Sequence, residues 1–135
     1  MKTEIIIERG KDNLFSAYST HLQNHILIGT GKSVEEAKQD LQSAYEDMKN
    51  SYIVNNKPIP KVLQDLSFDY KYDVSAFFNQ FSVINLSKFA LKANLSADML
   101  RQYKGGQYIS EPRAKEIETA VHALGKELLT VKITM

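Results

Sequence analysis

The chain contains no cysteine, which excludes a disulfide framework and a metal site built from thiolates. It also lacks a long hydrophobic segment, because no uninterrupted apolar run is longer than that of residues 5–7. No segment is therefore expected to span a membrane or to form the core of a signal peptide. With 43% hydrophobic and 24% charged residues, the composition is typical of a globular protein, and a cytoplasmic location is expected.

Charge is distributed unevenly along the 135 residues, although the net charge is only +1. Residues 1–80 carry 9 basic and 11 acidic side chains, whereas residues 81–135 carry 8 basic and 5 acidic ones. A chain of this length forms one ordinary domain or two small ones. The positive excess in the second part is expected if that part contacts phosphates.

The first half of the chain has the pattern of a small sheet with one helix. Strands are predicted over residues 3–8, 14–20 and 25–30, and the short loops between them suggest an antiparallel meander. Apolar residues recur at the helical period from residue 34 to about residue 54, which predicts a helix. The alternating residues 66–72 predict a fourth strand, so the order of elements is β-β-β-α-β.

The second half is predicted to be helical. Asp73 stands where an N-cap is expected, and the aromatic residues after it need a packing partner. The nearest partner is the helix pair that follows, so we place a domain boundary at Asp73, between residues 1–72 and 73–135. A further helix is predicted over residues 111–124 with Gly125 as its stop, and residues 128–133 alternate as a short C-terminal strand does.

Residues 86–106 have the pattern of two short helices joined by a tight turn, a helix-turn-helix signature. Asn94 is at the turn, where a positive φ is often needed and where Asn is tolerated. Ser96 is placed to cap the second helix, and Gly105 and Gly106 are placed to end it. The positions expected to pack the two helices together hold Phe89, Ala90, Ala93, Leu95, Leu100 and Tyr103.

The second helix of this pair is the predicted DNA-reading element. If Leu100 and Tyr103 point inward, the helical period turns the polar residues outward. Arg101 suits guanine and Gln102 suits adenine in the major groove, while the helix N-terminus suits a phosphate. The predicted DNA-binding residues are Ser96, Ala97, Asp98, Arg101, Gln102 and Lys104. The alternative is a helical hairpin whose polar face is merely solvated.

The sequence gives little support for a nucleotide-binding loop or a metal site. Gly31, Lys32 and Ser33 resemble the end of a phosphate-binding loop, but the glycine that such a loop needs five residues earlier is Ile26. A strand-to-helix turn is the better interpretation. His21 and His25 lack carboxylate neighbours at metal-ligand spacing. We therefore predict no metal site and no cofactor.

The β-β-β-α-β order is the first part of a ribonuclease-H-like fold, whose nucleases hold two magnesium ions with carboxylates. The available carboxylates do not fit this role well, because those on the helix point in different directions and those on the first strand flank its centre. Solvated charge is the better interpretation, and no catalysis is expected. The carboxylates concerned are Glu4, Glu8, Glu46, Asp47 and Asp69.

Several short motifs follow one another in an order known from one family. Gly29 and Gly31 precede Ser33-Val34-Glu35-Glu36-Ala37, and residues 57–60 read Lys-Pro-Ile-Pro. These motifs resemble the Gly-x-Gly, Ser/Thr-x-Glu-Glu-Ala turn and the Ile-Pro loop of the HicB-type antitoxins. The second half is similar to the family variant with a helix-turn-helix domain. One departure is that residues 19–25 replace the family's Asp-x-Pro-Gly-Cys-like segment.

The resemblance implies an α+β protein in which a partial ribonuclease-H-like domain, residues 1–72, precedes an all-α helix-turn-helix domain, residues 73–135, with a short C-terminal strand. It implies an antitoxin that binds a HicA-type toxin, a small ribonuclease that cleaves messenger RNA. It also implies repression of its own operon through double-stranded operator DNA, with a homodimer expected. The alternative is a stand-alone transcription regulator whose N-terminal domain senses a ligand or mediates assembly.

Overall fold

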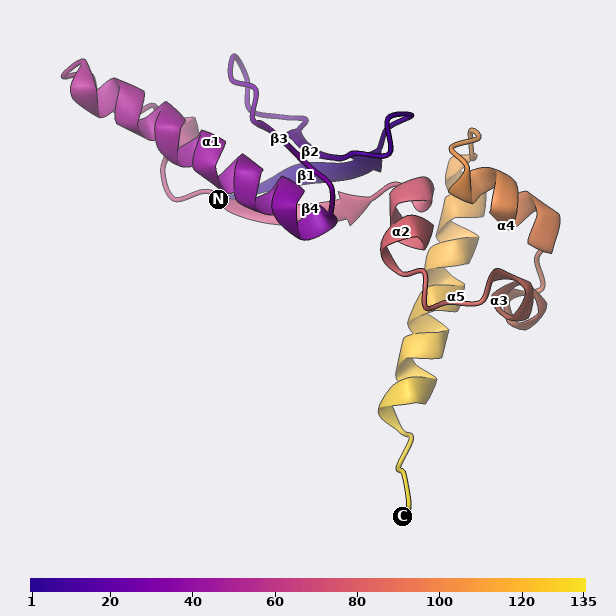
Figure 1. Cartoon of the computed structure of the whole chain (residues 1–135). Helices are drawn as coiled ribbons and strands as arrows, with labels where there is room; N and C mark the ends of the chain where they lie inside the picture. Colours follow the sequence, from indigo (N-terminus) through magenta and orange to yellow (C-terminus); the bar gives the residue numbers. More distant parts are fainter. The chain divides into compact units, whose positions relative to one another are not determined.

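The computed structural model describes residues 1–135 and has an α+β fold with a four-stranded mixed sheet and five α-helices (Figure 1). Contacts between residues divide the chain into two compact units, Met1–Gln80 and Phe81–Met135. All four strands belong to the first unit. No helix combines the length and the apolar composition that crossing a membrane requires.

The strands of the first unit are β1 (Lys2–Arg9), β2 (Phe15–Ser19), β3 (Ile28–Gly31) and β4 (Ser67–Tyr72). Their order across the sheet is β3-β2-β1-β4. The pairs β1–β2 and β2–β3 are antiparallel, which confirms the predicted meander. β4 pairs with β1 in parallel, and the helix between β3 and β4 provides the crossover that a parallel arrangement needs.

Helix α1 (Val34–Val54) lies along one face of this sheet (Figure 1). Alternate residues of β1 are buried, namely Thr3, Ile5 and Ile7, because successive side chains of a strand point to opposite faces. Tyr70 pairs with Ile5 and therefore lies on the same face. The apolar core also includes Phe15, Ala17, Leu22, Leu27, Val34, Ala37, Leu41, Tyr45, Leu63 and Ala76.

The close approach of α1 to β3 explains the glycine at position 29. A Cβ atom on Gly29 would collide with the backbone of Ala37 and Leu41 in α1, so only glycine lets the helix approach β3 this closely. Ser33 is the N-cap, and its Oγ accepts a hydrogen bond of 3.1 Å from the backbone N–H of Glu36. The segment is thus a close-packed strand-to-helix turn, as predicted.

Between α1 and β4 the chain forms a short 3₁₀ turn, Lys61–Leu63. The buried Tyr45 of α1 ties this turn to the core, because its hydroxyl donates to the carbonyl of Leu63 at 2.6 Å. The same hydroxyl accepts from the backbone N–H of Leu66 at 3.2 Å. One phenol therefore satisfies two backbone groups of the connection to β4.

Helix α2 (Val74–Gln80) belongs to the first unit, so the division of the chain differs from the predicted boundary by one helix. The reason is that Asp73 fastens α2 to the sheet. Its backbone N–H donates to the carbonyl of Ile7, and its carboxylate caps α2 by accepting from Ala76 N at 2.7 Å. Burial raises the pKa of Asp73, and the hydrogen bond from Ala76 partly opposes this shift.

The second unit contains α3 (Leu86–Ala93), α4 (Ala97–Lys104) and α5 (Glu111–Leu129). The predicted stop at Gly125 and the predicted C-terminal strand over residues 128–133 are both wrong. Gly125 has no positive φ and continues the helix. The residues after α5 form no strand, because the second unit offers no other strand to pair with.

Candidate nucleic-acid interface

Helices α3 and α4 are joined by a turn whose shape depends on one residue. Asn94 has φ 57° and ψ 44°, the left-handed conformation expected at this position. The turn also satisfies the end of α3, because the backbone N–H of Leu95 donates to the carbonyl of Ala90 at 2.9 Å. The local sequence therefore determines the angle at which α4 leaves α3.

Both helices are capped by side chains at their N-termini. Asn85 Oδ1 accepts from Lys88 N at 2.9 Å at the start of α3, and Ser96 Oγ accepts from Met99 N at 3.3 Å at the start of α4. At the end of α4, Gly106 has φ 101° and the N–H of Gln107 donates to the carbonyl of Gln102. This is a Schellman ending, so the predicted cap and stop of α4 are confirmed.

A small apolar core holds the three helices of the second unit together. Ala90 of α3 is almost fully buried, as expected where two helices cross closely. Leu100 and Tyr103 of α4 point inward as predicted, and Ile117 of α5 is buried with them. This packing determines which face of α4 is left for a partner.

The predicted DNA-binding residues lie on the remaining face of α4. Ser96, Asp98, Arg101 and Gln102 are exposed. Ala97 and Lys104 are also on α4 but are half-buried. The structure therefore presents a short row of polar side chains beside the capped N-terminus of a helix, where backbone N–H groups can bind an anion.

Arg101 makes hydrogen bonds to two side chains, one of them on the neighbouring helix. Its Nη1 donates to Asp98 Oδ1 of the same helix at 2.7 Å, and its Nη2 donates to Ser87 Oγ of α3 at 2.9 Å. Both terminal nitrogens of the guanidinium are thus held while the side chain stays exposed. The sequence-based prediction missed Ser87. The only signal for it is its place at the start of α3, where a helix pair brings it near α4.

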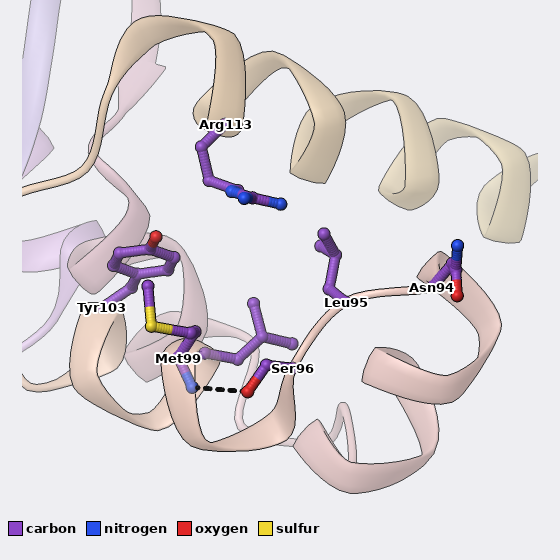
Figure 2. A pocket seen from close by; sticks show the side chains of 7 residues that line it. Asn94, Leu95, Ser96, Met99, Tyr103 and Arg113 are labelled. Carbon is purple, nitrogen blue, oxygen red and sulfur yellow. Dashed lines mark hydrogen bonds between the residues drawn. The ribbon is translucent and has the colours of Figure 1, made fainter.

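A small cavity lies between the α3–α4 turn, α4 and the start of α5 (Figure 2). Its volume is about 130 Å³, whereas pockets for small ligands usually enclose roughly 300–1,000 Å³. Arg113 at its rim donates from Nη1 to Glu116 Oε2 at 2.9 Å. The cavity is lined by Asn94, Leu95, Ser96, Met99, Leu100, Tyr103 and Arg113, and its size fits a packing gap better than a ligand site.

The carboxylates of the first strand are engaged by neighbouring side chains on the sheet face opposite α1. Glu4 accepts from Lys71 Nζ at 2.7 Å and from Thr20 Oγ1 at 3.0 Å, and these two hydrogen bonds, that from Lys71 first, lower its pKa. Glu8 accepts from the Tyr18 hydroxyl at 2.6 Å. Burial, followed by this hydrogen bond, raises the pKa of Tyr18 to about 12.

The remaining candidates for metal or acid–base chemistry are scattered. Glu46 accepts from Gln42 on α1, and Asp47 and Asp69 are exposed. His25 shares a hydrogen bond of 3.0 Å with the Tyr52 hydroxyl. No group of three or more His, Asp or Glu side chains is close enough to hold a metal ion.

The face of α4 combines a fork-shaped guanidinium, a carboxamide and a helix N-terminus. Groups of these kinds can donate hydrogen bonds to base edges and to phosphates. Comparison of the chain with protein-family models, with curated proteins and with solved structures finds no match. The functional proposal accordingly starts from the geometry of α3 and α4.

Proposed function

We propose that the protein is an antitoxin that binds operator DNA through a helix-turn-helix formed by α3 and α4. The observation that carries this proposal is the exposed Arg101, held by Asp98 and by Ser87 of the preceding helix. An arginine in a fixed pose loses little conformational freedom when it binds the O6 and N7 atoms of guanine. A merely solvated helix face has no need for such an arrangement.

In this proposal, α4 enters the major groove and the other groups around it set its position. Gln102 is suited to adenine, and the capped N-terminus of α4 is suited to a phosphate. The excess of 8 basic over 5 acidic side chains in residues 81–135 favours approach to the DNA backbone. Two copies would place their reading helices about one helical turn apart, roughly 34 Å.

The first unit supports the antitoxin part of the proposal. Its sheet order β3-β2-β1-β4, with one helix across one face, is compatible with a partial ribonuclease-H-like domain. We propose that this unit binds a HicA-type, mRNA-cleaving toxin in the cytoplasm and has no catalytic activity itself. Its 11 acidic against 9 basic side chains suit a basic, RNA-binding partner.

The rival function is a stand-alone regulator with a ligand-sensing or assembly domain. The two proposals differ in their genetic context, since an antitoxin is expected next to a gene for a small, basic, histidine-containing toxin. Co-expression with that neighbour followed by co-purification separates them. A complex with the neighbour supports the antitoxin, whereas a regulator that needs no neighbour should purify alone.

The DNA-binding part is tested with Arg101→Ala and Arg101→Lys, measured by fluorescence anisotropy on the operator of the protein's own operon. Arg101→Ala should weaken binding by about 1–3 kcal/mol and relax specificity at one base. Arg101→Lys keeps the charge but loses the planar fork, so it should lose specificity more than non-specific affinity.

Circular dichroism serves as the control for folding of both variants, and because Arg101 is exposed, both are expected to fold. If Arg101→Ala leaves the operator affinity and the specificity unchanged, α4 does not read the major groove.

A further inference from the structure

Strand β3 is one edge of the sheet in the first unit, because the order β3-β2-β1-β4 leaves it paired on one side only. The backbone N–H of Ser19 on β2 donates to the carbonyl of Leu27 at 2.9 Å. Bonded and non-bonded pairs alternate along an antiparallel ladder, so Ile28 and Thr30 take the non-bonded positions of β3. Their backbone N–H and C=O groups therefore point away from β2.

The edge at β3 is apolar on the sheet face opposite α1. Leu27 is fully buried in the core, whereas Ile26 and Ile28 on either side of it are 76% and 54% exposed, since successive side chains of an extended chain point to opposite faces. The other edge strand, β4, has the charged residues Asp69 and Lys71 on this face, and charges on an edge discourage pairing. The edge at β3 has no such protection.

The flank of α1 beside β3 is acidic. Asp40 lies there, because its Oδ2 accepts from the outward N–H of Thr30 at 2.9 Å. Glu36 is one turn before Asp40, and Asp47 is two turns after it on the same flank. All three carboxylates are exposed. Since Asp40 occupies the N–H of Thr30, strand pairing at this edge is left to the groups of Ile28.

Both lysines of α1 lie on its other flank, toward β4. Lys38 Nζ is 4.4 Å from the centre of the Tyr70 ring on β4. Lys49 Nζ is 4.2 Å from the centre of the Tyr45 ring, which itself packs against Phe68 of β4. The carboxylates beside β3 are therefore not neutralised by lysines of the same helix, and they favour a basic partner.

We infer that the edge of β3 binds an extended segment of a basic protein partner in which basic and apolar side chains alternate. The main chain of this segment pairs with Ile28 and adds one strand to the sheet. Its apolar side chains pack on Ile26 and Ile28, and its basic side chains, which point to the other face, lie beside Asp40 and Asp47.

A second copy of the chain fits this edge less well. Pairing of β3 with β3 would bring two acidic flanks of α1 together, and like charges repel. The inference deepens the proposed function and rests on it, because it gives the surface and the chemistry with which the first unit holds its basic partner.

A defined peptide tests this edge without the toxin. The probe is a short peptide with blocked ends in which lysine and valine alternate, titrated into the full ¹⁵N-labelled chain at low salt and followed by NMR. Amide signals of residues 26–30 should shift, and those of β4 should not. Two control peptides should bind roughly tenfold more weakly or less. One has the same composition with lysines and valines in separate blocks, and the other has glutamate in place of lysine.

Variants of the full chain separate the backbone contribution from that of charge. Ile28→Pro removes the outward N–H but no bond of the β2–β3 ladder, and Ile28→Lys leaves the backbone unchanged but repels a basic segment. Each should weaken peptide binding by about tenfold or more, whereas Ile28→Val should bind like the unmodified chain. Asp47→Lys should weaken binding by about threefold to tenfold. Glu46→Lys, the same charge change on the flank of Lys49, is the matched control and should have far less effect.

The inference is overturned if the peptide shifts signals of β4 instead of residues 26–30, if the block peptide binds equally well, or if Ile28→Lys binds like the unmodified chain. A particle mass that falls on Ile28→Lys would show that a second copy occupies this edge, with the same consequence. Co-purification with the neighbouring gene product tests the toxin function separately. A chain that binds the alternating peptide at β3 but not this neighbour contradicts the toxin function and leaves the strand site standing. A neighbour that co-purifies equally well with Ile28→Lys does the reverse.

Discussion

At the scale of single residues, the arrangement around Arg101 depends on one contact between helices. Asp98 is three positions away on α4, so its pairing with Arg101 is a local i,i+3 interaction of the kind that a helix allows. This exposed pair alone contributes little free energy. The bond from Arg101 to Ser87 joins α4 to α3 and adds direction. In the proposed DNA complex, Ser87 would position Arg101 rather than contact a base itself.

Replacing Ser87 tests whether its hydrogen bond to Arg101 matters for DNA binding. Ser87→Ala removes one hydrogen bond to the guanidinium and should weaken operator binding by about 1 kcal/mol. The loss should be largest on the native operator and smaller on an operator changed at the base that Arg101 contacts. Anisotropy titrations on both DNAs measure this difference, with Ser82→Ala as the exposed-serine control. Equal losses on both DNAs would contradict a role through Arg101.

At the scale of elements, two glycines with different surroundings show that packing decides whether a glycine is required at its position. Gly29 lies against the backbone of α1, whereas a Cβ atom on Gly125 would meet nothing within 4 Å. Gly125 is inside α5 and has an ordinary helical conformation. Gly29 is therefore required because α1 approaches β3 closely. Gly125 lowers the stability of α5 and gives no packing benefit in return.

The two glycines lead to opposite expectations for substitution by alanine. Gly125→Ala should raise the free energy of unfolding by about 0.5–1 kcal/mol, since alanine is the better helix former. Gly29→Ala should lower it by about 1–3 kcal/mol, because α1 must move away from β3. Urea denaturation followed by circular dichroism measures both. A destabilised Gly125→Ala would contradict the open space that the structure shows around this residue.

At the scale of the whole molecule, each unit has a hydrophobic core of its own. The core of Met1–Gln80 lies between the sheet and α1, and that of Phe81–Met135 lies between α3, α4 and α5. The charge excess also changes sign between the two units. This organisation favours two separate binding functions on one chain, with toxin binding proposed for the first unit and DNA binding for the second.

Separating the units tests this division of labour. A fragment of residues 81–135 should unfold cooperatively and bind the operator, although a domain of this size is only marginally stable. A fragment of residues 1–80 should still rescue growth of cells that express the toxin. Rescue by residues 81–135, or failure of residues 1–80 to co-purify with the toxin although folded, would contradict the assignment.

The sequence alone was sufficient for features that depend on neighbours along the chain. It predicted the β-β-β-α-β order, the cap at Ser96 and the left-handed Asn94, because each depends on a few consecutive residues. It also placed Arg101 on the outer face of α4, since the helical period decides this. These are the features of the fold and of the candidate site that local physics determines.

Only the tertiary structure decided the features that join distant residues. It set β4 beside β1, assigned α2 to the sheet through Asp73 and Ile7, and brought Ser87 to Arg101. It also showed that α5 continues through Gly125 and that the tail has no strand partner in its own unit. The physical reason is the same in each case. A strand needs a neighbour, a glycine ends a helix only where the backbone turns, and both conditions depend on contacts that spacing along the chain does not encode.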